Sequence, residues 1–369
     1  MRFFATAAKG TEPALRDELR ELRLRSVRAD RGGVHFEGEL SDGARACLWS
    51  RVAVRILVEV AVFEARDGDA LYEGVRTVDW TAWMTQRTTL AVRATCKSSR
   101  LTHSQFVAQK TKDAVVDTLR DRFGARPSVD RDDPDVLLAV HLVRDQATLY
   151  LDVGGASLHE RGWRAHAGPA PLRETLAAAV LRLSGWDRAR PLVDPMCGAG
   201  TIALEAAAWS RRAAPGLARA RFGLERWASH DDAGRETMRA LREQARAALL
   251  PDGPPIFASD VDPRAVELAR DNARIAGLSI TVEQRDVRDL TPLDPAGFVV
   301  ANPPYGERLA ADDPTESSLA RALLHMRGHT AALLAGTPAI GRAMKRPPDR
   351  WWILFNGPIE CRLLVYAIG

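Results

Sequence analysis

The sequence predicts an α/β protein in which a seven-stranded sheet follows two smaller α+β units. First, strands and helices alternate over the second half of the chain, a pattern typical of βαβ units and a parallel sheet. Second, the elements before residue 156 do not alternate in this way. Third, a segment rich in glycine and proline, 158–171, lies between the two patterns. A chain of 369 residues is long for one domain, and we expect the domains 1–65, 66–155 and 156–369.

The first segment, 1–65, has the pattern of a small α+β unit. Apolar residues indicate strands at 3–5, 34–37 and 51–63. Leucines recur at helical spacing after Thr11, which predicts a helix between the first two strands.

The second segment, 66–155, contains one clear amphipathic helix and several strands. Apolar side chains share one face from Ser104 to Phe123, and Gly124 is expected to end this helix. Strand patterns occur at 89–95, 135–142 and 147–153.

The third segment, 156–369, contains seven runs with strand character separated by helical patterns. The expected strands are 191–194, 256–259, 280–283, 298–301, 331–335, 351–355 and 361–367. The expected helices are 200–212, 235–249 and 263–276, the last with Asp262 as N-cap, Pro263 in its first turn and Gly277 at its end.

Composition and charge restrict the class of protein without fixing it. The net charge of +4 and the pI near 9.0 suit a nucleic-acid partner but do not require one. Arginine dominates the basic residues, which suits phosphate contacts and equally suits a GC-rich genome. No signal peptide and no run of about 18 apolar residues is present, so we expect a cytoplasmic protein without a membrane partner. The four cysteines are scattered singly, and we expect neither a metal site nor a disulfide framework.

The strongest local motif is a strand that runs into a turn containing Gly198 and Gly200 and then into a helix. A turn without Cβ atoms lets a ligand approach the backbone, and the helix start offers free N–H groups to a carboxylate such as that of a methionine moiety. Glycine in such turns can also be purely structural. The predicted cofactor contacts here are Asp194, Met196, Cys197, Gly198, Ala199, Gly200 and Thr201.

Two acidic residues follow the next two strands. Asp260, with Val261 beside it, can accept hydrogen bonds from a ribose hydroxyl pair. It lies 60 residues after Gly200, so a long helical insertion must come between them. Asp286, with Val287 beside it, can accept a hydrogen bond from an adenine amine. Each aspartate alone is more often a cap or turn residue.

The sequence Asn302-Pro303-Pro304-Tyr305 follows the fourth strand and carries the predicted chemistry. Ligands of open α/β sheets bind beyond the carboxyl ends of the strands, so this tetrapeptide should share a crevice with the glycine turn. The Asn302 side-chain oxygen and the Pro303 carbonyl can accept the two N–H bonds of an exocyclic amine and direct its lone pair at a sulfonium methyl group. Tyr305 offers a face on which a flipped base can stack. Asn302 is also expected to contact the cofactor.

These motifs resemble those of the THUMP-domain class I guanine-N2 RNA methyltransferases, which include large-subunit rRNA and tRNA enzymes. The resemblance rests on Asp194-Pro-Met-Cys-Gly-Ala-Gly-Thr, Asn302-Pro-Pro-Tyr-Gly-Glu-Arg-Leu and Phe355-Asn-Gly-Pro-Ile-Glu-Cys-Arg-Leu. It extends to the junction that begins at Leu158 and to the segment that begins at Phe4, and so covers nearly the whole chain. It implies ferredoxin-like and THUMP modules before a Rossmann-like methyltransferase domain that uses S-adenosylmethionine without metal. Phe355 stands where the family usually has tyrosine.

The resemblance implies a structured RNA partner, and the sequence leaves other substrates open. We expect 23S rRNA, with tRNA as the alternative. A DNA amino-methyltransferase and a catalytically silent RNA-binding assembly protein are the rival functions. Few residues follow Asn302, so we expect no second catalytic domain in this sequence. Arg308 is a candidate phosphate contact or an ordinary ion-pair partner. For the oligomeric state, we expect a monomer.

Overall fold

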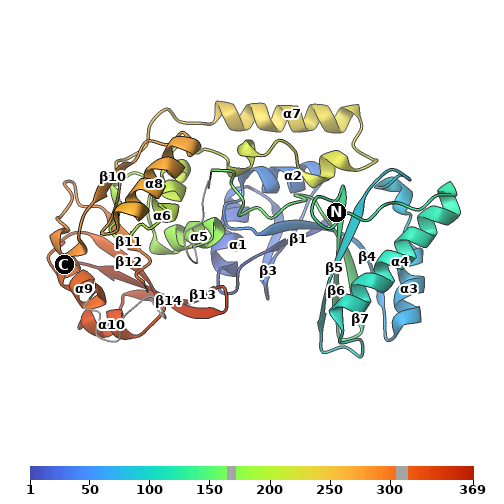
Figure 1. Cartoon of the computed structure of the whole chain (residues 1–369), viewed down its shortest axis with the longest axis horizontal. Coiled ribbons are helices and arrows are strands. Elements are labelled where there is room, and N and C mark those ends of the chain that lie inside the picture. Colours follow the sequence, from blue (N-terminus) through green and yellow to red (C-terminus); the bar gives the residue numbers. More distant parts are fainter. Residues whose placement is uncertain (164–171, 305–314) are drawn as a thin grey trace.

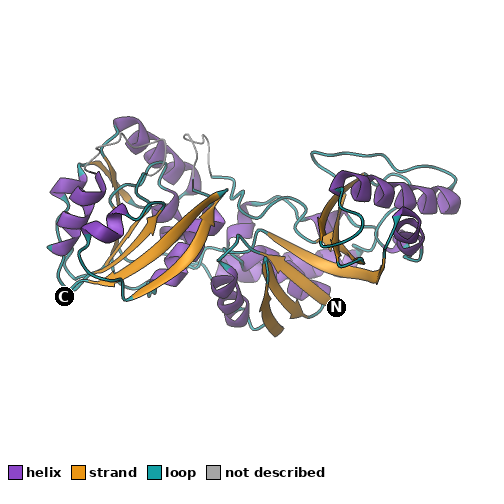
Figure 2. Cartoon of the chain, turned by 90° about the horizontal axis from the view of Figure 1, so that it is seen from below, coloured by secondary structure: helices purple, strands orange, loops and turns teal. Residues whose placement is uncertain are grey.

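The computed structural model describes residues 1–163, 172–304 and 315–369, which form two seven-stranded sheets flanked by helices (Figure 1). The first sheet has the order β2-β3-β1-β4-β7-β6-β5, and the second has the order β10-β9-β8-β11-β12-β14-β13. The second sheet lies at one end of an elongated molecule, and the first sheet extends away from it (Figure 2). The predicted fold class is confirmed.

The first sheet joins the two predicted N-terminal units. Its strands are β1 (Arg2–Thr6), β2 (Arg25–Asp30), β3 (Gly33–Glu37), β4 (Arg55–Glu64), β5 (Leu90–Lys97), β6 (Val136–Val143) and β7 (Gln146–Asp152). Its helices are α1 (Glu12–Glu21), α2 (Leu40–Trp49), α3 (Gly68–Arg76) and α4 (Ser104–Phe123). The long strand β4 pairs with β1 through 55–58 and with β7 through 57–64, which makes one sheet of both units.

The second sheet is mixed rather than wholly parallel. Its strands are β8 (Leu192–Asp194), β9 (Ile256–Asp260), β10 (Thr281–Gln284), β11 (Phe298–Ala301), β12 (Thr330–Ala335), β13 (Arg350–Asn356) and β14 (Ile359–Ala367). Six strands run in the same direction, whereas β14 runs antiparallel to its neighbours β12 and β13. The cause is local, because the two-residue connection Gly357-Pro358 can join only antiparallel neighbours.

Helices cover both faces of the second sheet (Figure 2). They are α5 (Glu174–Ser184), α6 (Thr201–Ser210), α8 (Pro263–Ala276), α9 (Thr315–Leu324) and α10 (Ala339–Ala343), whereas α7 (Asp232–Ala247) is not one of them. Side chains of α5, α6 and α8 form one apolar core with the sheet, and those of α9 and α10 form a second core. The strand order reverses between β8 and β11, which places a topological switch point at the centre of the sheet.

The segment between α6 and β9, 211–255, is the predicted helical insertion, and it packs on the first sheet rather than on the second. We call the first sheet and its helices α1 to α4 the N-terminal module. Helix α7 of the insertion lies along this module in Figure 1 and contacts α2. Phe222, Trp227 and Met238 from this segment are buried in the same core as the strands of the first sheet. The insertion therefore completes the core of the N-terminal module.

A buried charged cluster joins the N-terminal module to α6. Arg51, which follows α2, lies 3.3 Å from Glu205 of α6, and Arg161 lies 3.1 Å from the other oxygen of the same carboxylate. All three side chains are buried. Arg51 also donates to the carbonyls of Ala208 and Ala213. The helix that follows the glycine turn is therefore anchored to the N-terminal module.

Two further expectations concern membrane-spanning helices and the cysteine thiols. Within 1–163, 172–304 and 315–369, no helix is both long and apolar enough to cross a bilayer. None of the four cysteines is in a disulfide bond, and all but Cys96 are buried.

Candidate functional site

A cleft of about 780 Å³ lies at the carboxyl ends of the central strands of the second sheet. The residues that follow β8 and β11 lie on either side of the switch point and contribute to its wall. Of the predicted cofactor residues, those that line the cleft are Asp194, Met196, Cys197, Gly198, Ala199, Thr201, Asp260, Val261, Asp286, Val287 and Asn302. The structure thus brings together residues from four strand ends that are far apart in the sequence.

The two glycines of the turn have different surroundings. Gly198 has φ +51°, and a Cβ on it would meet no described atom within 4 Å, so the space beside it is open for a ligand. Gly200 does not line the cleft. Its φ is +82°, and a Cβ there would lie 3.2 Å from the Cβ of Ala269 on α8. Gly200 thus packs between two helices, and its predicted contact with the ligand stays a prediction.

Asp260 holds the glycine turn in place. One of its carboxylate oxygens accepts a hydrogen bond from the Gly198 N–H at 2.9 Å, and the other accepts one from the Asp262 N–H at 3.0 Å. Asn272 supports the same turn, because its side-chain amide donates to the Ala199 carbonyl at 3.0 Å. A carboxylate fixed at a strand end beside the open turn can still accept further hydrogen bonds from a ligand.

Asp194 is the most perturbed acid of the cleft. It is 1% exposed at the end of β8, and one oxygen receives the Met196 N–H at 3.4 Å. Burial raises the pKa of the Asp194 carboxyl to about 8, and the charge of Asp260 contributes to the increase. A ligand cation next to Asp194 would favour the ionised carboxylate.

Replacing Asp194 by asparagine is expected to change how stability depends on pH. The pKa of Asp194 is about 8 in the folded protein and about 3.9 in an unfolded chain. Between these values the folded protein holds a proton that the unfolded chain has released, so the unfolding free energy falls as the pH rises. Urea unfolding at several pH values from about 5 to about 8 should show this fall in the wild type and a smaller fall in Asp194→Asn. Equal slopes in the two proteins would contradict the raised pKa.

Asp286 is a cap as well as a cleft residue. Its carboxylate accepts hydrogen bonds from the backbone N–H of Arg288 at 2.9 Å and from the Arg288 guanidinium at 3.0 and 2.7 Å. These bonds lower the pKa of the Asp286 carboxyl to about 2. The carboxylate is thus ionised and held at the rim of the cleft, where Val287 lies next to it.

Asn302 follows β11 directly and presents an unusual oxygen. Its side-chain oxygen is buried and has no hydrogen-bond partner in the part of the chain that the structure describes. Pro303 is buried and Pro304 lines the cleft. A buried acceptor without a donor costs free energy, so this oxygen is suited to an N–H group of a ligand. Tyr305 and Arg308, also singled out in the sequence, lie outside the described residues.

Several residues of the cleft wall are not apparent from the sequence. They are Leu172, Pro195, Ile202, Asp262, Arg264, Ala265, Leu268, Arg285 and Thr315. Asp262 is the N-cap of α8, where its carboxylate accepts the Arg264 N–H at 2.9 Å. The signal that could have found them is proximity in sequence to the strand ends, since most of them lie within ten residues of one.

Cys197 and the histidines that the structure describes do not form a metal-binding cluster. Burial raises the pKa of the Cys197 thiol well above its ordinary value, so this thiol is unreactive at neutral pH. Among the residues that the structure describes, no group of three or more His, Cys, Asp or Glu side chains could hold a metal ion.

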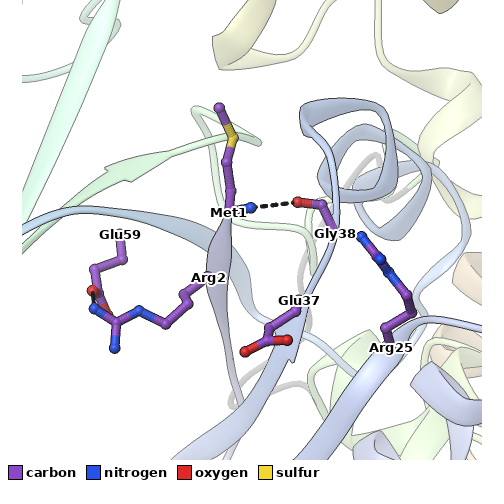
Figure 3. A pocket seen from close by; sticks show the side chains of 6 residues that line it. All are labelled: Met1, Arg2, Arg25, Glu37, Gly38 and Glu59. Carbon is purple, nitrogen blue, oxygen red and sulfur yellow. Dashed lines mark hydrogen bonds and ion pairs between the residues drawn. The ribbon is translucent and has the colours of Figure 1, made fainter.

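A second hollow, of about 440 Å³, lies at the start of β1 in the first sheet (Figure 3). The Met1 ammonium donates to the Gly38 carbonyl at 2.7 Å, and Arg2 forms an ion pair with Glu59. Its walls thus include charges that pair with one another, and it lies on the first sheet, whereas the switch point lies in the second. The cleft of the second sheet is the better candidate site.

Three family descriptions match consecutive stretches of the chain. The RlmL ferredoxin-like domain matches residues 2–57, the THUMP domain matches residues 65–152, and the RMKL-like methyltransferase domain matches residues 161–364. The last match alone covers more than half of the chain.

Individual relatives agree with these matches. Ribosomal RNA large subunit methyltransferase K/L of Syntrophotalea carbinolica is 44% identical over 383 residues, which cover 100% of this chain and 54% of the relative. The chain spans about half the length of the curated relatives it matches. The solved structure of SMU.472, described as a methyltransferase in complex with SAH, is 31% identical with a TM-score of 0.90 and covers 100% of this chain and 98% of that one. A protein of Listeria monocytogenes described as a predicted N6-adenine-specific DNA methylase is 31% identical, with a TM-score of 0.88 and coverage of 99% and 95%.

Proposed function

Since this chain belongs to the RMKL-like methyltransferase family, with THUMP and RlmL ferredoxin-like domains before the catalytic one, we propose that it methylates the exocyclic N2 of a guanosine in structured RNA. S-adenosylmethionine supplies the methyl group, and 23S rRNA is the substrate that we favour. Such a substrate places the reaction in the cytoplasm. We further propose that segments 1–65 and 66–155 deliver the RNA to the domain 156–369.

One observation carries this proposal: the buried oxygen of Asn302, which has no hydrogen-bond partner among the described residues, lies in the cleft that also contains the glycine turn. S-adenosylmethionine fits the residues present. The open space at Gly198 would admit its methionine part, and Asp260 would accept hydrogen bonds from its ribose. Asp194 would lie near its positive charge, and Asp286 near its base.

The chemistry of the chain's own residues follows from these positions. The lone pair of an exocyclic amine is delocalised into the ring, so the amine is a poor nucleophile. The Asn302 oxygen and the Pro303 carbonyl would accept its two N–H bonds and favour a tetrahedral nitrogen whose lone pair points at the methyl carbon. The two prolines restrict the backbone that carries these acceptors. S-adenosylmethionine, when bound, provides the electrophilic methyl group.

The direct test is to offer purified protein and labelled S-adenosylmethionine to ribosomal RNA, to tRNA and to plasmid DNA in parallel. We expect label in 23S rRNA, recovered after digestion as N2-methylguanosine. Label in tRNA alone would keep the reaction and replace the substrate. Label in DNA alone would refute the proposal and favour an amino-methyltransferase of DNA, and no label in any pool would favour the silent assembly protein.

Replacing Gly198 by alanine is expected to weaken binding of S-adenosylhomocysteine about tenfold or more, because an added methyl group in a filled contact costs about 1–3 kcal/mol. The matched control is Gly277→Ala at the end of α8. Gly277 has φ +62° and also has no described atom within 4 Å of a Cβ, so the backbone strain is similar. Calorimetric titration should show weaker binding only for Gly198→Ala. Equal affinities of the two variants would remove Gly198 from the ligand contact.

A further inference from the structure

The loop Ala7–Thr11 of the N-terminal module is fixed against the edge strand β13 of the second sheet. Gly10 has φ +91°, and a Cβ on it would lie 2.1 Å from the carbonyl oxygen of Ile353, so the two backbones are in direct contact. The carboxylate of Glu12 accepts the Gly10 N–H at 2.7 Å, and the Thr11 hydroxyl donates to the Ala8 carbonyl at 2.7 Å. The loop is therefore a built part of the surface beside β13.

This loop places a cation over an aromatic ring of β13. The ammonium nitrogen of Lys9 lies 3.7 Å from the centroid of the Phe355 ring. Lys9 is exposed and forms no ion pair with any carboxylate of the described residues. Both oxygens of the nearby Glu12 are occupied by the backbone N–H groups of Gly10 and Gly32. The Lys9 charge is therefore free to meet a ligand anion.

The same face of β13 carries a second pair of this kind. Alternate residues of a strand share a face, so Trp351 and Ile353 lie on the face of Phe355. Trp351 is 55% exposed and Ile353 is 41% exposed. The guanidinium of Arg362, which stands opposite Ile353 on β14, lies 5.9 Å from the Trp351 ring. We call these five residues, Lys9, Trp351, Ile353, Phe355 and Arg362, the β13 stripe.

The β13 stripe leads to the edge of the sheet where the cleft opens. β13 is parallel to β12, because both are antiparallel to β14, so Phe355 lies at the carboxyl edge that also bears Asn302. The register aligns Ala301, Leu333, Leu364 and Trp351 across the sheet. At strand dimensions of about 4.8 Å across and about 3.3 Å along, Phe355 lies about 14 Å sideways of Asn302 and about 10–13 Å beyond it. That separation suits a few linked nucleotides.

We propose that the β13 stripe binds a single-stranded segment of the RNA substrate next to the target base. Alternating cations and exposed rings are the chemistry that recognises such a strand: Lys9 and Arg362 meet phosphates, while Trp351 stacks on a base. The inference deepens the proposed function and rests on it for the identity of the RNA. It assigns a substrate contact to the segment that begins at Phe4 and to the motif that begins at Phe355. The methyl-transfer site uses neither of them.

The test measures binding of labelled oligouridine at several salt concentrations, which needs no methylation. Lys9→Met and Arg362→Met keep an apolar chain on the ring and remove the charge. Each should weaken binding about three- to tenfold and lower the slope of log K against log salt by about 0.7, the value for one phosphate contact of a single strand. Trp351→Leu should weaken binding with little change in slope. Lys9→Arg keeps the charge and should therefore bind with the affinity and salt slope of the wild type, which a purely structural role of Lys9 would not require.

The control is Lys345→Met, because Lys345 is exposed and precedes β13, at the opposite edge of the sheet. Its affinity and salt slope should equal those of the wild type. In the methylation assay, the stripe variants should raise KM for RNA and leave kcat within about twofold. Unchanged binding and slope in Lys9→Met and Arg362→Met would overturn the stripe even if the enzyme methylates RNA. If these variants lost oligouridine binding and the enzyme methylated only DNA, the β13 stripe would stand and the proposed function would be refuted. A change of oligomeric state in Trp351→Leu without loss of oligouridine binding would also overturn it.

Discussion

Asn302→Ala is expected to lower kcat for methyl transfer by about 10²–10³-fold, the usual cost of losing one hydrogen-bond partner of the transition state. The side-chain oxygen that this variant removes is buried in the cleft and has no described donor of its own. Its removal should therefore disturb the folded protein little. Single-turnover kinetics with labelled S-adenosylmethionine and the RNA substrate measure the effect directly.

Two comparisons separate chemistry from binding in this variant. Affinity for S-adenosylhomocysteine should stay within about threefold of the wild type, because the main cofactor contacts that we propose are the glycine turn and Asp260, which this variant leaves intact. Asn302→Asp keeps an acceptor oxygen at the same position and should retain more activity than Asn302→Ala. Full turnover by Asn302→Ala would show that the amine is activated by other groups.

Arg51→Ala is expected to destabilise the protein by about 3–5 kcal/mol, the cost of removing one member of a buried ion pair. Arg51 is buried, and burial lowers the pKa of its guanidinium to about 10, which still leaves it charged at neutral pH. The substitution removes one cation beside Glu205 and the donor to the carbonyls of Ala208 and Ala213. Urea unfolding at neutral pH, followed by tryptophan fluorescence, gives the change in free energy.

The control for this prediction is Arg235→Ala on α7, which breaks an exposed ion pair with Asp232. Exposed pairs contribute about 0–1 kcal/mol, so this variant should unfold almost as the wild type does. Glu205→Gln leaves two buried guanidinium groups without a carboxylate and should resemble Arg51→Ala. If Arg51→Ala were no less stable than Arg235→Ala, the buried cluster would not hold the two modules together.

Much of the fold could be predicted from the sequence because local signals agree with it. Helix α4 was predicted with its observed ends, since an apolar face and a terminating glycine mark it. Strand β2 was not predicted, because it lies at a sheet edge and almost all of its residues are exposed, so no alternation appears. Helix α5 was missed for the opposite reason, since nearly every residue is buried and no polar face reveals its period. The union of the two N-terminal units in one sheet depends on long-range pairing of β4, which leaves no local pattern.

The residues of the candidate site also divide into those that local sequence signals predict and those that depend on long-range contacts. Asp260 and Asn302 could be found because each stands where a predicted strand ends, and strand ends of one sheet meet. The packing of Gly200 against α8 could not be predicted, because the sequence does not show which helix lies beside the turn. Arg51 and Glu205 are 154 residues apart and could not be paired by any local rule.

The insertion 211–255, which shares its core with the first sheet, has a consequence for which substrates can react. Because this segment and the Arg51 cluster fasten the N-terminal module to the helix beside the glycine turn, the span from that module to the cleft is a fixed length. Under the proposed function, an RNA bound at one end of the molecule would have to present its guanine at that distance and be folded already to do so. The protein would then select a nucleotide by its position in the three-dimensional RNA and not by the bases around it.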